Sequence, residues 1–357
     1  NQPKTESYDF TRAVRFGEFE GIERFSGIRG WSGFAGAFAI LYVSLQGGND
    51  VNSLRISIVQ YLNTAPLVRG FTHGPLRGKY DLSFTVPSQC AEALRSGAVD
   101  LAIIPAIEYQ RIPHLAVVPN LSIASKKAVR SLLLISRKPV NELTRIALDR
   151  GSRSTQALTR ILCQRLWRIE PEFFEAEPEL PPMLQKADAA LLIGDPALRV
   201  SYAIEQEARR DASGALQCPG AIAGVAEYPA LYVYDIVEQW RGLTKLPAVL
   251  AVWAGRRAAV TPEVVQDFQQ SLAFGLQHLD EISAEASPEL KLPAAHLRRY
   301  LTENIDYTLD EENIQGLGVY YRYAAEMGLI PEVKDIERAP EPGGVVRHSD
   351  FIVKLGQ

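Results

Sequence analysis

Short apolar runs alternate with helical stretches between residues 55 and 255, and this alternation restricts the fold more than any other feature. The runs are RISIV, DLSFTV, DLAIIP, SLLLIS, RIALD, AALLIG, LYVYDI and AVLAVWA. Apolar strands separated by helices are typical of a largely parallel α/β sheet covered on both faces. After about residue 260 the pattern becomes helical. Since 357 residues exceed the usual size of one hydrophobic core, we expect two lobes.

No repeat or low-complexity linker separates these lobes, so the chain is expected to cross from one lobe to the other and return. The runs at 131–136 and 248–254 are the candidate crossings. The expected division is lobe 1 at 53–135 plus 250–345, lobe 2 at 136–249, and a loose tail at 346–357.

Residues 1–52 are expected to be a non-core N-terminal extension. Their apolar run at 30–48 follows mixed-charge residues, whereas a secretory signal has a short basic start. The run is also too short for a confident transmembrane helix. We hypothesise that translation naturally starts at Val51, just before the first recognisable strand.

Charge and cysteine content exclude several classes of protein. The net charge is -4 with dispersed Lys and Arg, so there is no basic stripe to bind nucleic acid. The three cysteines, Cys90, Cys163 and Cys218, lack CxxC spacing and nearby histidines, so neither a disulfide framework nor a metal site is indicated. We expect buried, reduced thiols in a cytoplasmic protein without a membrane partner.

A strand followed by Leu62-Asn63-Thr64-Ala65-Pro66 is the most informative single motif. It places Asn63 and Thr64 beyond the carboxyl end of a strand, where α/β proteins bind small ligands. Asn and Thr are also ordinary N-caps, so on these residues alone a solvated helix cap is enough to explain Asn63.

Two further strand ends carry polar residues. After the strand that ends at Asp149, the residues Ser152, Arg153, Ser154 and Thr155 open a helix. Free N–H groups, hydroxyls and an Arg at a helix N-terminus suit a carboxylate or phosphate, although an N-cap with a solvated Arg has the same pattern. Asp195-Pro196 follows the next buried strand, and here Asp195 is expected as an N-cap or as a site residue. No GxxxxGK[ST] or GxGxxG occurs at the helix start around Ser152, which counts against a nucleotide.

Taken in order, these motifs resemble one family, the chorismate dehydratases of the futalosine route to menaquinone, often called MqnA. The resemblance covers roughly residues 54 to 330. It rests on Leu62 to Leu67, Gly97-x-x-Asp100 with Glu108, Val129-Arg130-Ser131, Ser152 to Thr155, Ala187 to Asp195, and Trp240 to Trp253. Lys245 and Ala248 depart from the Gly and Phe of the family pattern, and Ser154-Thr155 inverts its Thr-Ser.

The resemblance implies a two-lobed α/β fold like that of type II periplasmic binding proteins, with discontinuous lobes and a helical C-terminal part. It implies conversion of chorismate to 3-[(1-carboxyvinyl)oxy]benzoate and water, without a metal or redox cofactor. Asn63 and Ser131 match active-site positions, and Glu108 is a candidate catalytic residue. The expected substrate-binding residues are Thr64, Ser152, Arg153, Ser154, Thr155 and Asp195.

The base, the oligomeric state and two rival functions stay open at this point. None of the five histidines lies in a matched motif, which leaves Glu108, Asp195 or the substrate's own enolpyruvyl carboxylate as the base. The protein is expected to be a monomer or a homodimer. The rival functions are a non-catalytic solute-binding protein for small acids and the related 1,4-dihydroxy-6-naphthoate synthase.

Overall fold

The computed structural model describes residues 53–207, 209–210, 216–217, 231–340 and 352–353. All of these residues belong to one compact unit, Leu41–Gln357. The predicted extension at 1–52, its apolar run, the proposed start at Val51, and Cys218 lie outside the described residues.

The first sheet contains five strands within the described residues, in the order β2-β1-β3-β12-β4. Their bounds are β1 Arg55–Val59, β2 Asp81–Thr85, β3 Leu101–Pro105, β4 Leu115–Ser125 and β12 Ala248–Arg256. Strands β2, β1 and β3 are parallel, whereas β12 runs antiparallel to both β3 and β4. Strand β12, the last of these five in the sequence, therefore lies in the interior of the first sheet.

The second sheet also has five described strands, in the order β11-β5-β8-β6-β7. Their bounds are β5 Leu132–Ser136, β6 Arg145–Asp149, β7 Glu172–Ala176, β8 Ala189–Ile193 and β11 Tyr232–Asp235. Strands β7, β6 and β8 are parallel, and β5 is antiparallel to β8 and β11. The short pairs β9 Arg209–Arg210 with β10 Leu216–Gln217, and β13 Ile336–Glu337 with β14 Ile352–Val353, are antiparallel.

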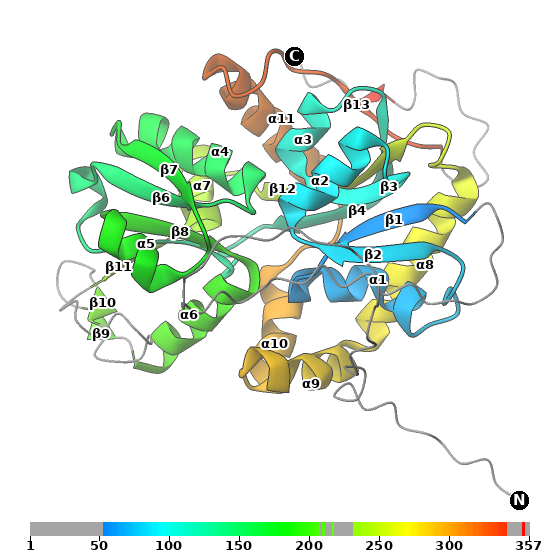
Figure 1. Cartoon of the computed structure of the whole chain (residues 1–357), viewed down its shortest axis with the longest axis horizontal. Helices are drawn as coiled ribbons and strands as arrows, with labels where there is room; N and C mark the ends of the chain where they lie inside the picture. The colour runs from blue at the N-terminus through cyan, green and yellow to red at the C-terminus, as the bar shows by residue number, and fades with distance from the viewer. Residues whose placement is uncertain (1–52, 208, 211–215, 218–230, 341–351, 354–357) are drawn as a thin grey trace, which may run out of the picture. The chain divides into compact units, whose positions relative to one another are not determined.

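Helices connect these strands and cover both sheets (Figure 1). The α-helices are α1 Ala65–Thr72, α2 Pro87–Ser96, α3 Ala106–Arg111, α4 Arg153–Leu162, α5 Leu180–Lys186, α6 Gly194–Glu207, α7 Ile236–Thr244, α8 Pro262–Gln277, α9 Leu279–Leu290, α10 Ala294–Arg299 and α11 Glu311–Glu326. The shorter helical turns are η1 Leu62–Thr64, η2 Val140–Glu142, η3 Cys163–Trp167 and η4 Tyr300–Asn304.

Strand residues alternate between two apolar clusters in the second sheet. Leu132 and Leu134 belong to a large cluster that includes residues of α4 and α7, whereas Leu133 and Ile135 belong to a smaller one with residues of α5 and α6. Because successive strand side chains point to opposite faces, this alternation shows that helices cover both faces of the sheet. Strand β8, AALLI, is buried throughout and therefore forms a continuous apolar run.

The expectation of a largely parallel sheet holds for only part of each sheet. Strand β5 is the first strand after the chain leaves the first sheet, and β12 is the first strand after it returns. Both pair antiparallel with their neighbours. The chain leaves the first sheet after Ser125 and returns to it at Ala248. The lobe limits 53–135 plus 250–345 and 136–249 stay a prediction.

Other expectations need correction. Strands β4 and β7 were not anticipated, because LAVVPNLSIAS contains a Pro and EFFEA is a half-exposed edge strand. Part of the expected loose tail forms β14, which pairs with β13, while the rest of that tail lies outside the described residues. Lys245 has a φ of 64°, so it adopts the left-handed conformation for which the family pattern has Gly.

Helices α1 and α8 approach each other closely, and α1 directly follows the Asn63 turn. A Cβ atom at Gly275 would lie 1.9 Å from the carbonyl oxygen of Pro66. A Cβ at Gly70 would lie 2.6 Å from the Cα of Ser271, whose hydroxyl donates to Leu67 over 2.8 Å. The absence of side chains at these glycines thus sets how α1 lies on α8.

We expect Gly275→Ala to destabilise the protein by about 1–3 kcal/mol, since backbone must move to admit the methyl group. Urea denaturation followed by circular dichroism measures the free energy of unfolding. Gly242→Ala is the matched control, because no atom lies within 4 Å of a Cβ there and alanine favours helix α7. Equal midpoints for the two variants would contradict the close approach.

Candidate active site

The turn after β1 buries its polar side chains. Asn63 and Thr64 lie in η1, and they are 8% and 1% exposed. Thr64 Oγ1 donates to Asn63 Oδ1 over 3.3 Å, and Thr64 makes no side-chain cap at the start of α1. A solvated helix cap is therefore the wrong explanation of Asn63, because its side chain is withdrawn from water.

A buried tyrosine joins this turn to the start of β5. Tyr300, the first residue of η4, donates its hydroxyl to Ser131 Oγ over 2.8 Å. Burial raises the pKa of Tyr300 above its ordinary value of 10, an effect opposed by its side-chain hydrogen bonds with Ser131 and Asn63. The phenol therefore keeps its proton at neutral pH and acts as a hydrogen-bond donor. Sequence reasoning missed Tyr300, because it lies far along the chain from Asn63 and carries no motif.

The end of β8 contacts the same turn. Asp195 Oδ1 accepts a hydrogen bond from Leu62 N over 3.1 Å, and Gly194 N donates to Ser131 O over 2.8 Å. Gly194 has a φ of 62°, and a Cβ there would lie 2.7 Å from the ring of Tyr61. Helix α6 begins at Gly194, so Asp195 is the second residue of the helix rather than its N-cap as predicted, and its carboxylate accepts from Leu62 N.

A second carboxylate, Asp149, lies at the end of β6. Its Oδ1 accepts from Gly151 N over 2.9 Å and its Oδ2 from Ile193 N over 3.3 Å. Burial raises the pKa of both Asp149 and Asp195, in each case to about 6. Burial and the charges of these two carboxylates raise the pKa of Tyr61. Carboxyl groups perturbed in this way cluster at functional sites.

The start of α4 is held by contacts with α3 and α11 rather than by a side-chain cap. Ser152 precedes the helix, is 4% exposed, and makes no side-chain cap hydrogen bond. Ser154 Oγ accepts from Ile107 N over 3.2 Å, and the Tyr320 hydroxyl donates to Ser154 O over 3.1 Å. Thr155 is buried in the same turn. The first turn of α4 is therefore fixed against α3 and α11.

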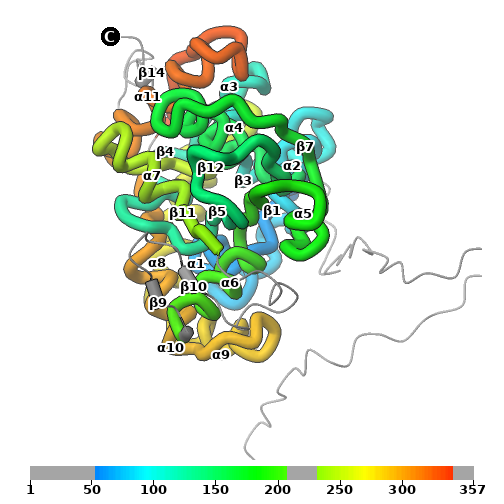
Figure 2. Tube along the Cα trace, turned by 90° about the vertical axis from the view of Figure 1, so that its left-hand side faces the viewer, coloured from blue at the N-terminus to red at the C-terminus, as the bar shows by residue number. Residues whose placement is uncertain are grey.

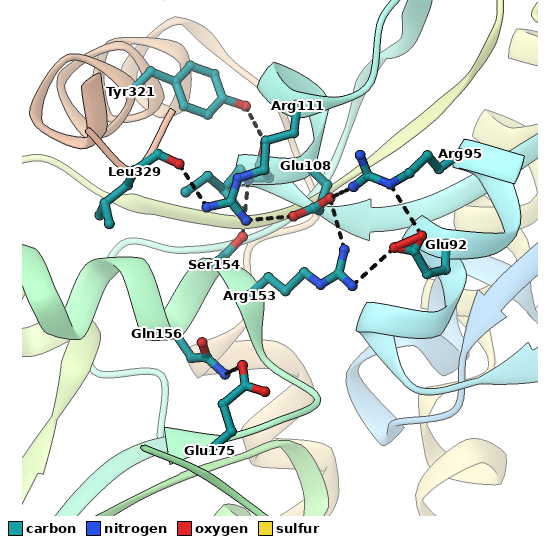
Figure 3. A network of polar contacts seen from close by, with 12 residues as sticks. Glu92, Arg95, Glu108, Arg111, Arg153, Ser154, Gln156, Glu175, Tyr321 and Leu329 are labelled. Atoms are coloured by element: carbon teal, nitrogen blue, oxygen red, sulfur yellow. Dashed lines mark hydrogen bonds and ion pairs between the residues drawn. The ribbon is translucent and has the colours of Figure 1, made fainter. Parts of the chain in front are cut away.

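Arg153 and Glu108 belong to a separate network of ion pairs (Figure 3). Glu108 is fully buried and pairs with Arg111 at 2.8 Å, with Arg153 at 3.1 Å, and with Arg95. Arg153 also reaches Glu92, at 3.3 Å. In this structure Glu108 is thus surrounded by cations, and Arg153 is engaged with protein carboxylates. Their predicted roles, catalytic and substrate-binding, stay predictions.

The structure thus brings some predicted residues together and separates others. Asn63 and Ser131 meet at Tyr300, and Asp195 joins them through Leu62. Ser152 follows Gly151, at which a Cβ would lie 3.9 Å from the Tyr61 hydroxyl. We call Tyr61, Asn63, Ser131, Asp195 and Tyr300 the central cluster. Arg153 and Ser154 instead contact α3, the helix that carries Glu108.

Among the described residues, no group of three or more His, Cys, Asp or Glu side chains could hold a metal ion. In that same part of the chain, no helix combines the length and the apolarity needed to cross a membrane.

Solved structures define the class of fold. The crystal structure of a protein from Archaeoglobus fulgidus matches with a TM-score of 0.57 at 18% identity, covering 78% of this chain and 98% of that chain. The periplasmic aliphatic sulphonate binding protein of Escherichia coli matches with a TM-score of 0.51 at 16% identity, covering 83% of this chain and 96% of that chain. The predicted periplasmic-binding-protein-like α/β fold is confirmed.

Sequence comparison then gives the family. The model of a family described as menaquinone biosynthesis matches residues 54–326, and the chain belongs to this family. The chorismate dehydratase of Thermus thermophilus is 28% identical over 277 residues, which cover 77% of this chain and 95% of that protein. The family membership expected from the motifs is confirmed.

We expect the variant Asp195→Asn to be more stable than the natural protein at pH 7.5 by up to about 3 kcal/mol. An acid whose pKa is about 6 when folded and 3.8 in its ordinary state lowers stability as pH rises from about 4 to 6. Asparagine avoids this loss and can still accept from Leu62 N. Urea denaturation at several pH values measures the free energy of unfolding of the variant and of the natural protein.

The difference between variant and natural protein is expected to vanish near pH 4, where the folded acid is protonated. Asp81→Asn is the control, because Asp81 is exposed. A difference that stays constant from pH 4 to 7.5 would refute the raised pKa of Asp195.

Proposed function

We propose that this protein is a chorismate dehydratase, a hydro-lyase that converts chorismate to 3-[(1-carboxyvinyl)oxy]benzoate and water in menaquinone biosynthesis. Its family membership and its similarity to the Thermus thermophilus enzyme support this. The observation that carries the proposal is the convergence of Asn63, Ser131 and Asp195, from distant segments, on the hydroxyl of Tyr300 and the turn beside it. Loss of water creates an aromatic ring, which provides the driving force.

The central cluster supplies donors to the part of the substrate that reacts. Asn63, Ser131 and Tyr300 carry neutral hydrogen-bonding groups in a buried setting, where such bonds are strong. Directed at the departing hydroxyl or the enolpyruvyl oxygen, they stabilise the charge that develops as the C–O bond breaks. Thr64 orients Asn63 through its hydroxyl.

The start of α4 is the proposed carboxylate site. The hydroxyls of Ser152 and Thr155 and the N-terminal backbone of this ten-residue helix favour an anion. Arg153 and Ser154 bind α3 and its neighbours, so we assign them the role of positioning this turn. Glu108 then acts on the substrate only through Arg153.

Two carboxylates are candidates for the base. Asp195 belongs to the central cluster, and burial raises its pKa to about 6, which suits a general base near neutral pH. The other candidate is the substrate's own enolpyruvyl carboxylate, held within reach of the proton by the cluster. Glu108 is already paired with three arginines within the protein, so its carboxylate is engaged away from the central cluster.

The cytoplasm is the proposed compartment, with the chain acting as a monomer or a homodimer. Cys90 and Cys163 are free and buried, and burial raises the pKa of each thiol to about 12. Buried thiols of this kind are inert and do not need an oxidising compartment.

Purified protein should convert chorismate to an aromatic product, followed by ultraviolet absorbance and mass spectrometry. We expect Asn63→Ala and Ser131→Ala to lower kcat by about 10²- to 10³-fold, as removal of a donor to a developing oxyanion does. Ser96→Ala, on the exposed end of α2, is the control and should keep full activity. Chorismate that binds without being converted would indicate a solute-binding protein instead.

The base is tested by comparing Asp195→Asn with Glu108→Gln after both are shown to fold. If Asp195 is the base, its variant should lose about 10²- to 10⁴-fold in kcat and the limb of the pH profile near pH 6. If the substrate's carboxylate is the base, that limb should remain and the loss should be small. A large loss in kcat confined to folded Glu108→Gln would overturn its positioning role.

A further inference from the structure

Tyr61 carries a hydroxyl to which the proposed function gives no role. The residue lies between β1 and η1, and its hydroxyl makes no hydrogen bond with any described residue. The described residues do not fully enclose this oxygen, so a ligand can reach it. Tyr300 differs, because its hydroxyl already donates to Ser131 over 2.8 Å. Tyr61 therefore supplies the central cluster with a donor that is still available to a ligand.

The ring of Tyr61 is held in place before a ligand arrives. A Cβ at Gly194 would lie 2.7 Å from a carbon of this ring, so the ring lies directly against the backbone at the start of α6. Leu62, the next residue, donates its N–H to Asp195 Oδ1 over 3.1 Å. Figure 2 shows α6 close to α1, the helix that follows η1. The Tyr61 hydroxyl thus has a set position, as a preorganised donor requires.

Two carboxylates face the hydroxyl of Tyr61. A Cβ at Gly151 would lie 3.2 Å from Asp149 Oδ1 and 3.9 Å from the Tyr61 hydroxyl, which places these two groups near each other. Asp195 also acts on this hydroxyl, and its Oδ2 makes no hydrogen bond with any described residue and is not fully enclosed. Both carboxylates have a pKa of about 6, so they are mainly ionised at neutral pH. Their charges and burial raise the pKa of Tyr61, so the phenol keeps its proton and donates.

These charges restrict the ligand group that Tyr61 can bind. Asp149 and Asp195 repel a carboxylate or a phosphate, and an ammonium has no lone pair to accept from the phenol. A neutral hydroxyl meets both demands, since its oxygen accepts one hydrogen bond and donates another. We propose that Tyr61 binds the hydroxyl that leaves chorismate, which accepts from the phenol and donates to Oδ2 of Asp195. This inference rests on the proposed function.

Bound in this way, the departing hydroxyl is stabilised as it leaves. When the C–O bond breaks, its electron pair moves to the oxygen, and the hydrogen bond from Tyr61 strengthens. Tyr61 keeps its own proton, because two neighbouring carboxylates disfavour a phenolate. The proton that the base removes from the ring completes the water molecule. Tyr61 therefore distinguishes chorismate from the product, whose ring no longer carries this hydroxyl.

Tyr61→Phe tests the inference, because it removes one hydroxyl without a partner in the described chain and keeps the ring against Gly194. We expect kcat/KM for chorismate to fall by about 10²- to 10³-fold, as loss of a donor to developing charge does. Binding of the product, 3-[(1-carboxyvinyl)oxy]benzoate, measured by isothermal titration calorimetry, should stay unchanged. Tyr323→Phe on α11 is the matched control and should leave both measurements unchanged.

The split between chorismate and product decides the outcome. The inference is overturned if Tyr61→Phe converts chorismate at the natural rate, or if product binding weakens as much as conversion, which would indicate a purely structural role. If the natural protein binds chorismate without converting it, the proposed function fails. The inference then stands only if Tyr61→Phe weakens chorismate binding by about tenfold and leaves product binding intact. Absence of chorismate binding would overturn both.

Discussion

The buried carboxylate of Glu108 is the interaction on which the arrangement of the two sheets most depends. Arg95 of α2, Arg111 of α3 and Arg153 of α4 all pair with it, so helices that follow strands of both sheets meet at one charge. A buried carboxylate without partners would be costly, and three guanidinium groups offset that cost. The same contacts set the first turn of α4, whose backbone we assign to the substrate.

Local sequence signals were sufficient to predict where strands end, but not which residues each strand end contacts. The runs that became β1, β6 and β8, and the turns at Asn63, Ser152 and Asp195, follow from periodicity and turn residues. Tyr300 could not be found in this way, because only tertiary folding brings η4 to Ser131. The pairing of Arg153 with Glu108 could not be predicted either, since an arginine at a helix start is equally suited to binding an anionic ligand.

Buried, perturbed groups surround Tyr61. Asp149 ends β6, Asp195 follows the neighbouring strand β8, and both raise the pKa of the Tyr61 hydroxyl, while Gly194 leaves room for its ring. Two carboxylates with pKa values of about 6 lower stability near neutral pH. Such a cost is common at functional sites, where polar groups are held ready for substrate rather than for the free protein.

Strand β12 occupies an interior position of the first sheet although it is formed by Ala248–Arg256. During synthesis on the ribosome, β3 and β4 cannot pair with β12 until the whole second sheet has emerged. Until then both nascent strands expose unpaired edges, which invite association with other chains. The topology therefore predicts slow maturation of the first sheet and a need for protection by chaperones, even though four of its five described strands are made first.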